Sequence, residues 1–160
     1  MRAPTLAVLL ATAIVAACGQ GGDKAEDAGP ADSAATAPAP ATDAEKQAAL
    51  AALPAPYNTA DLENGRKKYA LCRSCHTLNE GGARMTGPNL HDIFGAKAGA
   101  GDFTYSEGLK QSGLTWEPAS MDPWIANPRA VVPGTRMAFA GVRDAKDRTD
   151  LIAYLMVETR

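Results

Sequence analysis

Aromatic residues are missing from the first third of this 160-residue chain. All three Phe, both Trp and all four Tyr lie at or after Tyr57. A segment that lacks aromatics and is rich in Ala, Pro, Asp and Gly cannot bury enough apolar surface to form a core. We therefore expect one folded domain over residues 57–160, which is small for a self-sufficient hydrophobic core.

Long apolar runs and an excess charge of one sign are also lacking. The apolar stretch from Thr5 to Ala17 has 13 residues, whereas a helix needs about 20 to cross a bilayer. From residue 57 onward, 13 basic residues stand against 12 acidic ones. No basic stripe with interleaved aromatics occurs, so we expect no nucleic-acid partner.

The N-terminus is typical of an export signal. Arg2 followed by the short apolar run predicts a signal peptide over residues 1–17. The run ends in Val15-Ala16-Ala17-Cys18-Gly19, which resembles a bacterial lipoprotein signal. That resemblance implies cleavage before Cys18 and a lipid on this residue. We expect a lipid anchor on the periplasmic side of a bacterial membrane, with plain secretion of a soluble periplasmic protein as the alternative.

Residues 18–56 are expected to be a disordered tether between lipid and domain. The segment is rich in Ala and Pro and contains the run Ala37-Pro38-Ala39-Pro40. As a flexible coil it would reach roughly 35 Å. Residues 44–53 can form a short Ala-rich helix, but isolated helices of this length are marginal.

Cysteine and histidine are scarce, and most of them stand in one motif. The chain has three Cys and two His, and residues 72–76 read Cys72-Arg73-Ser74-Cys75-His76. C-x-x-C-H is the attachment motif of c-type haem. On a helix, positions 72, 75 and 76 share a face, so two thioethers and a proximal His76 ligand to iron can form. The sequence therefore predicts one covalent haem c.

Other interpretations of this motif fit the sequence less well. A zinc site normally needs four nitrogen or sulfur ligands, and a redox dithiol needs a strand–helix context that is not present near residue 72. A disulfide across so short a loop would leave His76 without a role.

Helical periodicity flanks the motif. A helix is predicted from a cap at Asn58 or Thr59 to about Cys75, with Leu62, Gly65, Tyr69, Cys72 and His76 on one stripe. Gly65 costs about 1 kcal/mol relative to Ala in a helix, and close approach of another helix is a reason to keep it. The candidate partner is the last helix, which Asp144 can cap.

The middle of the chain predicts short elements and long loops. A short helix can begin at Ser120, with Pro123 in its first turn, and should end before Pro128. No alternating pattern of useful length indicates a strand. We therefore predict an all-α fold in which the first and last helices of the domain pack together.

Several motifs, taken together and in order, resemble the class I c-type cytochromes of the mitochondrial type. The most specific is Val132-Pro133-Gly134-Thr135-Arg136-Met137-Ala138-Phe139-Ala140-Gly141. The others are Thr86-Gly87-Pro88-Asn89-Leu90-His91, Phe103-Thr104-Tyr105, Leu114-Thr115-Trp116, Asn127-Pro128 and Asp150-Leu151-Ile152-Ala153-Tyr154-Leu155. The resemblance covers about residues 57–160 and implies the cytochrome c fold, with loops around a covalently bound haem.

The resemblance also implies roles for single residues. Met137 would be the second axial ligand, and the Pro88 carbonyl would accept the other ring N–H of His76. Tyr105, Trp116 and Thr135 would serve the haem propionates, and Phe139 would pack at the haem edge. For Tyr105 and Trp116, packing in the core is the alternative interpretation.

Met/His ligation typically belongs to electron transfer, so the resemblance implies an electron carrier and not an enzyme. We expect a monomer that takes electrons from a quinol–cytochrome c reductase type of donor. It would pass them to a terminal oxidase or another reductase, in a respiratory or photosynthetic chain. Leu109 and Trp124 depart from the family pattern near Met137. They leave open a peroxidase-like or gas-binding protein with a labile Met ligand. A fixed haem subunit of a larger complex is a further alternative.

Overall fold

The computed structural model describes residues 41–160, so the predicted signal peptide, Cys18 and most of the predicted tether lie outside the described residues. The described part is helical, in the order α1 (Asp43–Ala51), η1 (Tyr57–Thr59), α2 (Leu62–Tyr69), α3 (Glu107–Lys110), α4 (Pro118–Ala126), α5 (Pro128–Val131) and α6 (Ala145–Glu158). It contains no β-strand, only an isolated antiparallel bridge between Lys97 and Thr115. The all-α prediction is confirmed.

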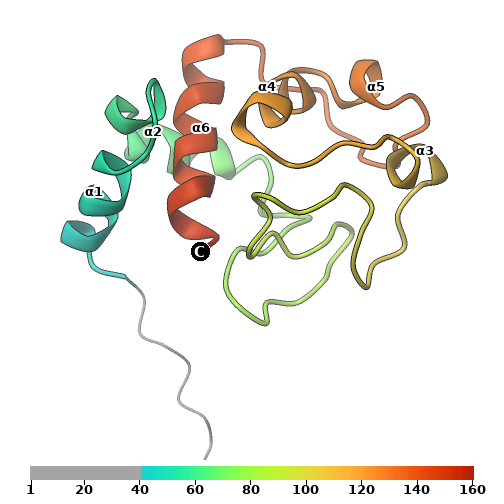
Figure 1. Cartoon of the computed structure of the whole chain (residues 1–160), viewed down its shortest axis with the longest axis horizontal. Coiled ribbons are helices and arrows are strands. Elements are labelled where there is room, and N and C mark those ends of the chain that lie inside the picture. The colour runs from blue at the N-terminus through green and yellow to red at the C-terminus, as the bar shows by residue number, and fades with distance from the viewer. Residues whose placement is uncertain (1–40) are drawn as a thin grey trace, which may run out of the picture. The chain divides into compact units, whose positions relative to one another are not determined.

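Helix α6 is the axis of the domain, and the other elements surround it (Figure 1). Its Leu151, Ile152 and Ala153 have no exposed surface. On one side lie α1 and α2, and on the other lie α4 and the long loops (Figure 1). In the described part of the chain no helix has the length and apolar character needed to span a membrane.

The predicted packing of the first and last helices of the domain is present, and Gly65 is where they meet. A Cβ atom at Gly65 would overlap the Asp150 carbonyl oxygen and lie 2.6 Å from Cβ of Tyr154. Only glycine therefore allows α2 to lie this close to α6. The close approach inferred from the sequence is confirmed.

The start of α2 differs from the prediction. Asn58 and Thr59 belong to the 3₁₀ helix η1, and the cap of α2 is Asp61, whose carboxylate accepts from the Asn64 N–H at 3.0 Å. The regular helix also ends at Tyr69, after which the chain continues in successive turns to Cys75. The apolar periodicity identified the helix. It did not fix the first residue, because Asn58, Thr59 and Asp61 are all residue types that can cap a helix.

Helix α1 contradicts the tether prediction for residues 43–53. Thr42 and Glu45 form a reciprocal capping box at its N-terminus. Leu50 and Leu53 are buried in a small cluster with Ala153 of α6. Packing on α6 supplies the stability that an isolated helix of this length lacks.

The main core, here called the main cluster, lies between α6, α4 and the loops. Its buried members are Ala98, Leu109, Trp116, Met121, Trp124, Ile125, Val132, Val142, Leu151, Ile152 and Leu155. Helix α4 begins at Pro118, earlier than predicted, because Ser120 binds the Glu117 N–H from the N3 position of a capping box. It ends before Pro128 as expected, and Asp144 caps α6 as expected.

Candidate haem-attachment site

Residues Cys72–His76, here called the attachment turn, form one helical turn after α2. The Cys72 carbonyl accepts from the Cys75 N–H at 2.9 Å and from the His76 N–H at 3.0 Å. This geometry places the two thiols and the imidazole on one side of the turn, as the spacing predicts. Both thiols are free, and burial raises the pKa of Cys72 to about 11. The Cys72 thiol is therefore protonated, and both thiols are free on the same side of the turn, as attachment of one macrocycle requires.

His76 presents a single free ring nitrogen. Its Nδ1 lies 2.7 Å from the Pro88 carbonyl oxygen, so Nδ1–H donates and Nε2 is left as the basic atom. Burial lowers the pKa of His76. The ring is therefore neutral at pH 7, which is the form that binds a metal. The His76–Pro88 contact expected from the sequence is present.

Gly87 allows the loop to lie flat against this imidazole. A Cβ atom at Gly87 would overlap the ring, at 2.8 Å from Nδ1 and 2.9 Å from Nε2. The Gly87 N–H also donates to the Cys75 carbonyl at 2.9 Å. Hydrogen bonds between this loop and both Cys75 and His76 thus join it to the attachment turn.

Tyr69 is a site residue that the sequence analysis missed. Its hydroxyl donates to the His76 carbonyl at 2.7 Å. The predicted stripe included Tyr69, but only as a packing residue. The spacing of seven residues placed Tyr69 and His76 on the same face, and that spacing was the signal available in the sequence.

Met137 lies in the loop between α5 and α6. Its backbone N–H donates to the Thr135 hydroxyl at 3.2 Å, after a turn in which Gly134 has a φ of +82°. The Met137 side chain packs against the main cluster, as does Cys72. The structure therefore brings the predicted thioether ligand to the same apolar region as the attachment turn.

The remaining predicted residues adjoin this region. Trp116 is 6% exposed, with its ring 5.2 Å from that of Trp124. Tyr105 and Phe139 pack against the main cluster as partly buried side chains. Within residues 41–160, the Trp116 indole N–H and the Tyr105 hydroxyl make no hydrogen bond. Both donors are thus available to a carboxylate, although Trp116 is also a core residue.

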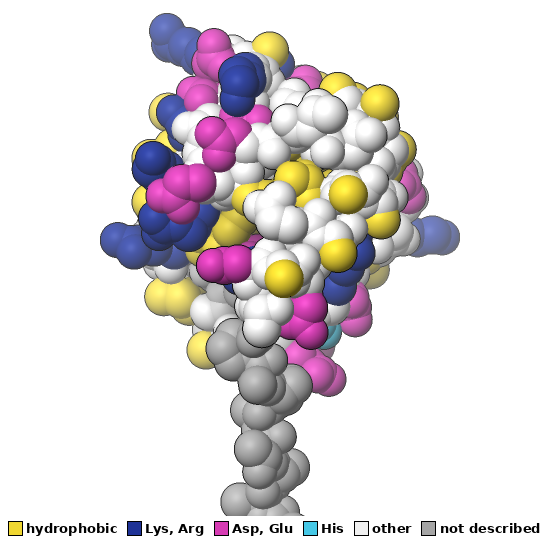
Figure 2. All heavy atoms as spheres, turned by 90° about the vertical axis from the view of Figure 1, so that its left-hand side faces the viewer, with side chains coloured by type: hydrophobic (Ala, Val, Ile, Leu, Met, Phe, Trp, Pro, Cys, Tyr) yellow, Lys and Arg dark blue, Asp and Glu magenta, His cyan; other side chains and the backbone are white. Residues whose placement is uncertain are grey.

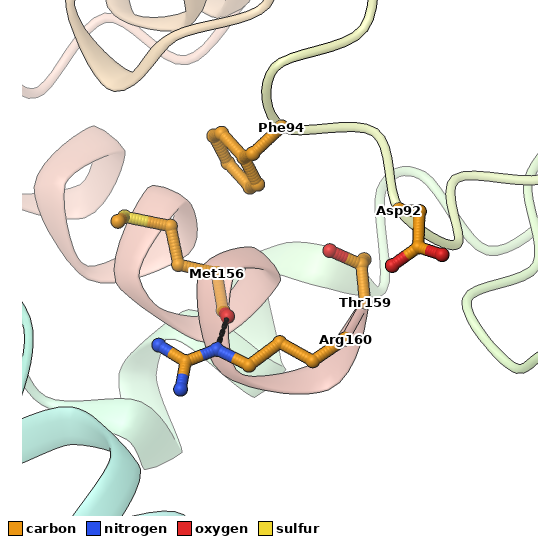
Figure 3. A pocket seen from close by; sticks show the side chains of 5 residues that line it. All are labelled: Asp92, Phe94, Met156, Thr159 and Arg160. Carbon is orange, nitrogen blue, oxygen red and sulfur yellow. Dashed lines mark hydrogen bonds between the residues drawn. The ribbon is translucent and has the colours of Figure 1, made fainter.

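A separate shallow pocket lies at the C-terminal end of α6. Its lining residues are Asp92, Phe94, Met156, Thr159 and Arg160 (Figure 3). None of the predicted haem residues lines it, and the Arg160 Nε–H points back to the Met156 carbonyl at 2.7 Å. This pocket is not a candidate for the haem.

The residues present fit a covalently held haem. Two thiols share one side of a turn, a neutral imidazole offers one nitrogen, and a thioether lies in the same apolar region. No group of three or more His, Cys, Asp or Glu side chains in the described residues gathers to hold a metal ion. His76 and Met137 each offer one soft or borderline donor, a pair that suits the two axial positions of haem iron.

Comparison with known proteins agrees with this geometry. The cytochrome c family model matches residues 62–157. Cytochrome c of Theileria parva is 44% identical over 96 residues, which cover 59% of this chain and 84% of that protein. Cytochrome c2 of Rhodomicrobium vannielii is 39% identical over 103 residues, covering 64% of this chain and 82% of that protein.

A solved structure shows the same fold. Cytochrome cH from Methylobacterium extorquens is similar with a TM-score of 0.57 and 43% identity, over 60% of this chain and 97% of that one. The matched region contains the attachment turn, the Pro88 loop and the Met137 loop, whereas α1 precedes the family match. The chain therefore belongs to the cytochrome c family, has its all-α fold, and carries one covalently attached haem c.

Proposed function

We propose that this chain carries single electrons outside the cytoplasm between membrane-bound redox complexes, with His76 and Met137 as the axial ligands of its haem. Family membership supports a monohaem electron carrier. The observation that carries the ligand assignment is the His76 ring, whose Nδ1 donates to Pro88 and whose Nε2 is left for iron.

The two proposed ligands contribute in different ways. The Pro88 carbonyl fixes the tautomer of His76 and increases the basicity of Nε2. A thioether such as that of Met137 favours ferrous iron and raises the reduction potential. When bound, the haem supplies an iron that gains and loses one electron. If His76 and Met137 both held the iron, no position would be left for oxygen or peroxide, which would favour electron transfer over catalysis.

Exposed apolar side chains beside the attachment turn support docking of a redox partner there. Leu71 is 56% exposed and Met85 is 48% exposed. Leu71 precedes Cys72, and Met85 lies two residues before Gly87, which binds the Cys75 carbonyl. Electron-transfer encounters use small, weak interfaces. A contact made by these two exposed apolar side chains, next to the haem attachment, suits such a brief encounter.

Charge contributes little to the expected docking. On the face that carries α1 and α2, acidic and basic side chains lie intermingled (Figure 2). The 13 basic and 12 acidic residues from position 57 onward are nearly balanced. We therefore expect electron transfer to a partner to depend only weakly on ionic strength.

We also propose a lipid anchor at Cys18, joined to the domain by a tether shorter than the predicted residues 18–56. Because residues 43–53 fold onto α6, the segment between Cys18 and the domain has about 24 residues. As a flexible coil it would reach about 27 Å. Replacement of Cys18 by Ser should release the protein from membranes to the soluble fraction. A Cys18→Ser variant that fractionates like the wild type would contradict lipid anchoring.

Visible spectra of the holoprotein with and without carbon monoxide test the ligand assignment. We expect low-spin ferric and ferrous spectra, a weak far-red iron–thioether band, and no change with carbon monoxide. Met137→Ala should remove the band and allow carbon monoxide to bind, whereas Met85→Ala, at an exposed methionine, should not. Ready binding of carbon monoxide by the wild type would overturn Met137 ligation and favour a peroxidase-like or gas-binding protein.

A further inference from the structure

Tyr69 is in contact with two different parts of the molecule. Its ring packs against Tyr154 of α6, with centroids 5.8 Å apart and planes inclined at 38°. Its hydroxyl reaches forward to the His76 carbonyl, at 2.7 Å. A single side chain therefore links the α2–α6 helix pair to the residue that we assign as proximal ligand.

His76 is held at three separate atoms. Its N–H donates to the Cys72 carbonyl at 3.0 Å, and its Nδ1 contacts the Pro88 carbonyl at 2.7 Å. Its own carbonyl accepts from the Tyr69 hydroxyl. Among residues 41–160 no backbone N–H donates to this carbonyl, because helical geometry stops at the attachment turn. The Tyr69 hydroxyl thus takes the place of the backbone donor that a longer helix would supply.

Tyr69 is suited to this role by its environment. The ring is fixed by the contact with Tyr154, which limits how far the hydroxyl can move. The donor is therefore presented to His76 in a defined direction.

We propose that Tyr69 is a positioning residue that transmits the packing of α2 on α6 to the orientation of the His76 ring. The inference rests on the proposed function, in which His76 Nε2 holds the iron. With the backbone N–H, the carbonyl and Nδ1 of His76 all bound, the attachment turn cannot unwind and the ring has little freedom to rotate. Without the hydroxyl, the carbonyl end of the turn is released, and only the Pro88 contact and the packing of Gly87 against the imidazole orient the ring.

Tyr69→Phe tests this proposal, with Tyr154→Phe as the matched control. Both variants keep an aromatic ring at the α2–α6 contact, but only Tyr69→Phe removes the hydrogen bond to His76. The readout is the set of haem-methyl resonances in the NMR spectrum of the ferric holoprotein, because their spread reports the orientation of the axial ligand planes. We expect the spread to change in Tyr69→Phe and to keep its wild-type value in Tyr154→Phe.

A second readout separates positioning from general loosening. The Met137 methyl resonance should keep its ligand-shifted position in Tyr69→Phe, whereas partial unfolding would move or abolish it. In the wild type, the Tyr69 hydroxyl proton should be in slow exchange and show a cross-relaxation contact to His76 or Thr77. This measurement needs no variant and remains decisive if Tyr69→Phe fails to fold.

Two results would overturn the proposal, and a third would overturn its basis. Wild-type haem-methyl shifts in Tyr69→Phe, or equal changes in Tyr69→Phe and Tyr154→Phe, would show that the hydroxyl does not orient His76. A wild-type protein without the spectra of a His-ligated low-spin haem would instead contradict the proposed function. The visible spectra of the wild type, recorded without carbon monoxide, distinguish these cases.

Discussion

The two early helices that pack on α6, α2 and α1, are held in very different ways. Helix α2 lies so close to α6 that no Cβ fits at Gly65, and it ends where Tyr69 reaches His76. Helix α1 contacts α6 through buried Leu50 and one ion pair, and buried Leu53, just after the helix, adds to the contact. The first contact fixes the haem-attachment turn, and the second fixes the point at which the N-terminal segment enters the domain. We infer that the haem side of the domain is rigid and that the tether side is more easily released.

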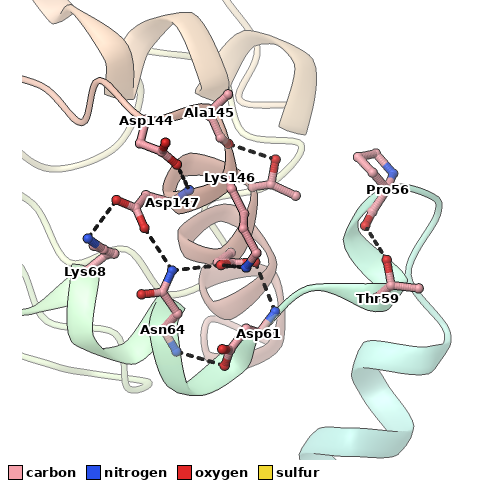
Figure 4. Close-up of polar contacts among 11 residues, drawn as sticks. Pro56, Thr59, Asp61, Asn64, Lys68, Asp144, Ala145, Lys146 and Asp147 are labelled. Atoms are coloured by element: carbon pink, nitrogen blue, oxygen red, sulfur yellow. Dashed lines mark hydrogen bonds and ion pairs between the residues drawn. The ribbon is translucent and has the colours of Figure 1, made fainter.

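Polar contacts reinforce the packing of α2 on α6, and Figure 4 shows Asp61, Asn64 and Lys68 beside α6. Asp150 is 1% exposed, and its two oxygens accept from the Asp61 N–H at 3.0 Å, from Asn64 Nδ2 at 2.8 Å and from Lys146 Nζ at 2.6 Å. Asn64 also donates to Asp147, which is paired with Lys68. The start of α2 is therefore bound to α6 by hydrogen bonds that water cannot easily replace.

Gly65→Val should have the largest effect on the packing of α2 against α6. The added side chain would overlap the Asp150 carbonyl and Tyr154 Cβ, so α2 would have to move away from α6. Overpacking of this kind costs about 3 kcal/mol, measurable as the free energy of unfolding of the holoprotein in denaturant. Lys67→Val, on the exposed side of α2, is the control and should cost less than about 1 kcal/mol. Equal losses in the two variants would show that the close approach does not matter.

Asp150→Ala should be the next most harmful change. It leaves the partly buried Asp61 N–H without its acceptor and removes one of the two acceptors of the Asn64 amide, and an unsatisfied buried donor costs about 1–3 kcal/mol. We expect a loss of about 2–3 kcal/mol in the free energy of unfolding, with slower folding if the network forms early. Glu63→Ala removes an exposed carboxylate of α2 and should be nearly neutral. A neutral Asp150→Ala would mean that water replaces the carboxylate.

Acid should weaken the same contact without any mutation. Burial alone would raise the pKa of Asp150, but hydrogen bonds from Lys146, Asn64 and Asp61 outweigh it and lower the pKa. An Asp in the unfolded chain titrates near 3.9. The stabilisation is therefore complete above about pH 4 and is lost as the pH falls through the lower folded value. Unfolding curves between pH 6 and 2 should show a smaller acid loss in Asp150→Asn than in the wild type.

Leu50→Ala should affect only the α1 side. Leu50 is 7% exposed, but it belongs to a small cluster at the edge of the domain, so we expect a loss of about 1–2 kcal/mol, below the usual range for a central core leucine. Amide hydrogen exchange should become faster in residues 43–53 and stay unchanged in α2 and the attachment turn. The haem spectrum should not change. Faster exchange in both helices would show that α1 and α2 open together, against the proposed difference.

The same comparison shows which features of the structure were accessible from sequence. Gly65 could be interpreted because a glycine inside an amphipathic stripe weakens its helix and is best accounted for by the close approach of a second helix. The Pro88 contact followed from the family motif. A short helix over residues 44–53 was considered, but its packing was not predicted, because Leu50 and Leu53 depend for burial on α6, about 100 residues later. The Tyr69 hydrogen bond was missed because apolar periodicity locates a ring but says nothing about its hydroxyl.

The ion pair between Lys46 and Glu158 should contribute least. The two groups are 2.6 Å apart, with side chains 28% and 20% exposed, so water screens them partly and a contribution of at most about 1 kcal/mol is expected. Lys46→Met keeps the aliphatic stem and removes the charge. It should speed amide exchange of α1 slightly at low salt and have no effect at 1 M salt, where charges are screened within about 3 Å. No effect of Lys46→Met at low salt would mean that the aliphatic stem of Lys46, which methionine keeps, holds α1 in place and that the charge does not. The contact between α1 and α6 would then be wholly apolar.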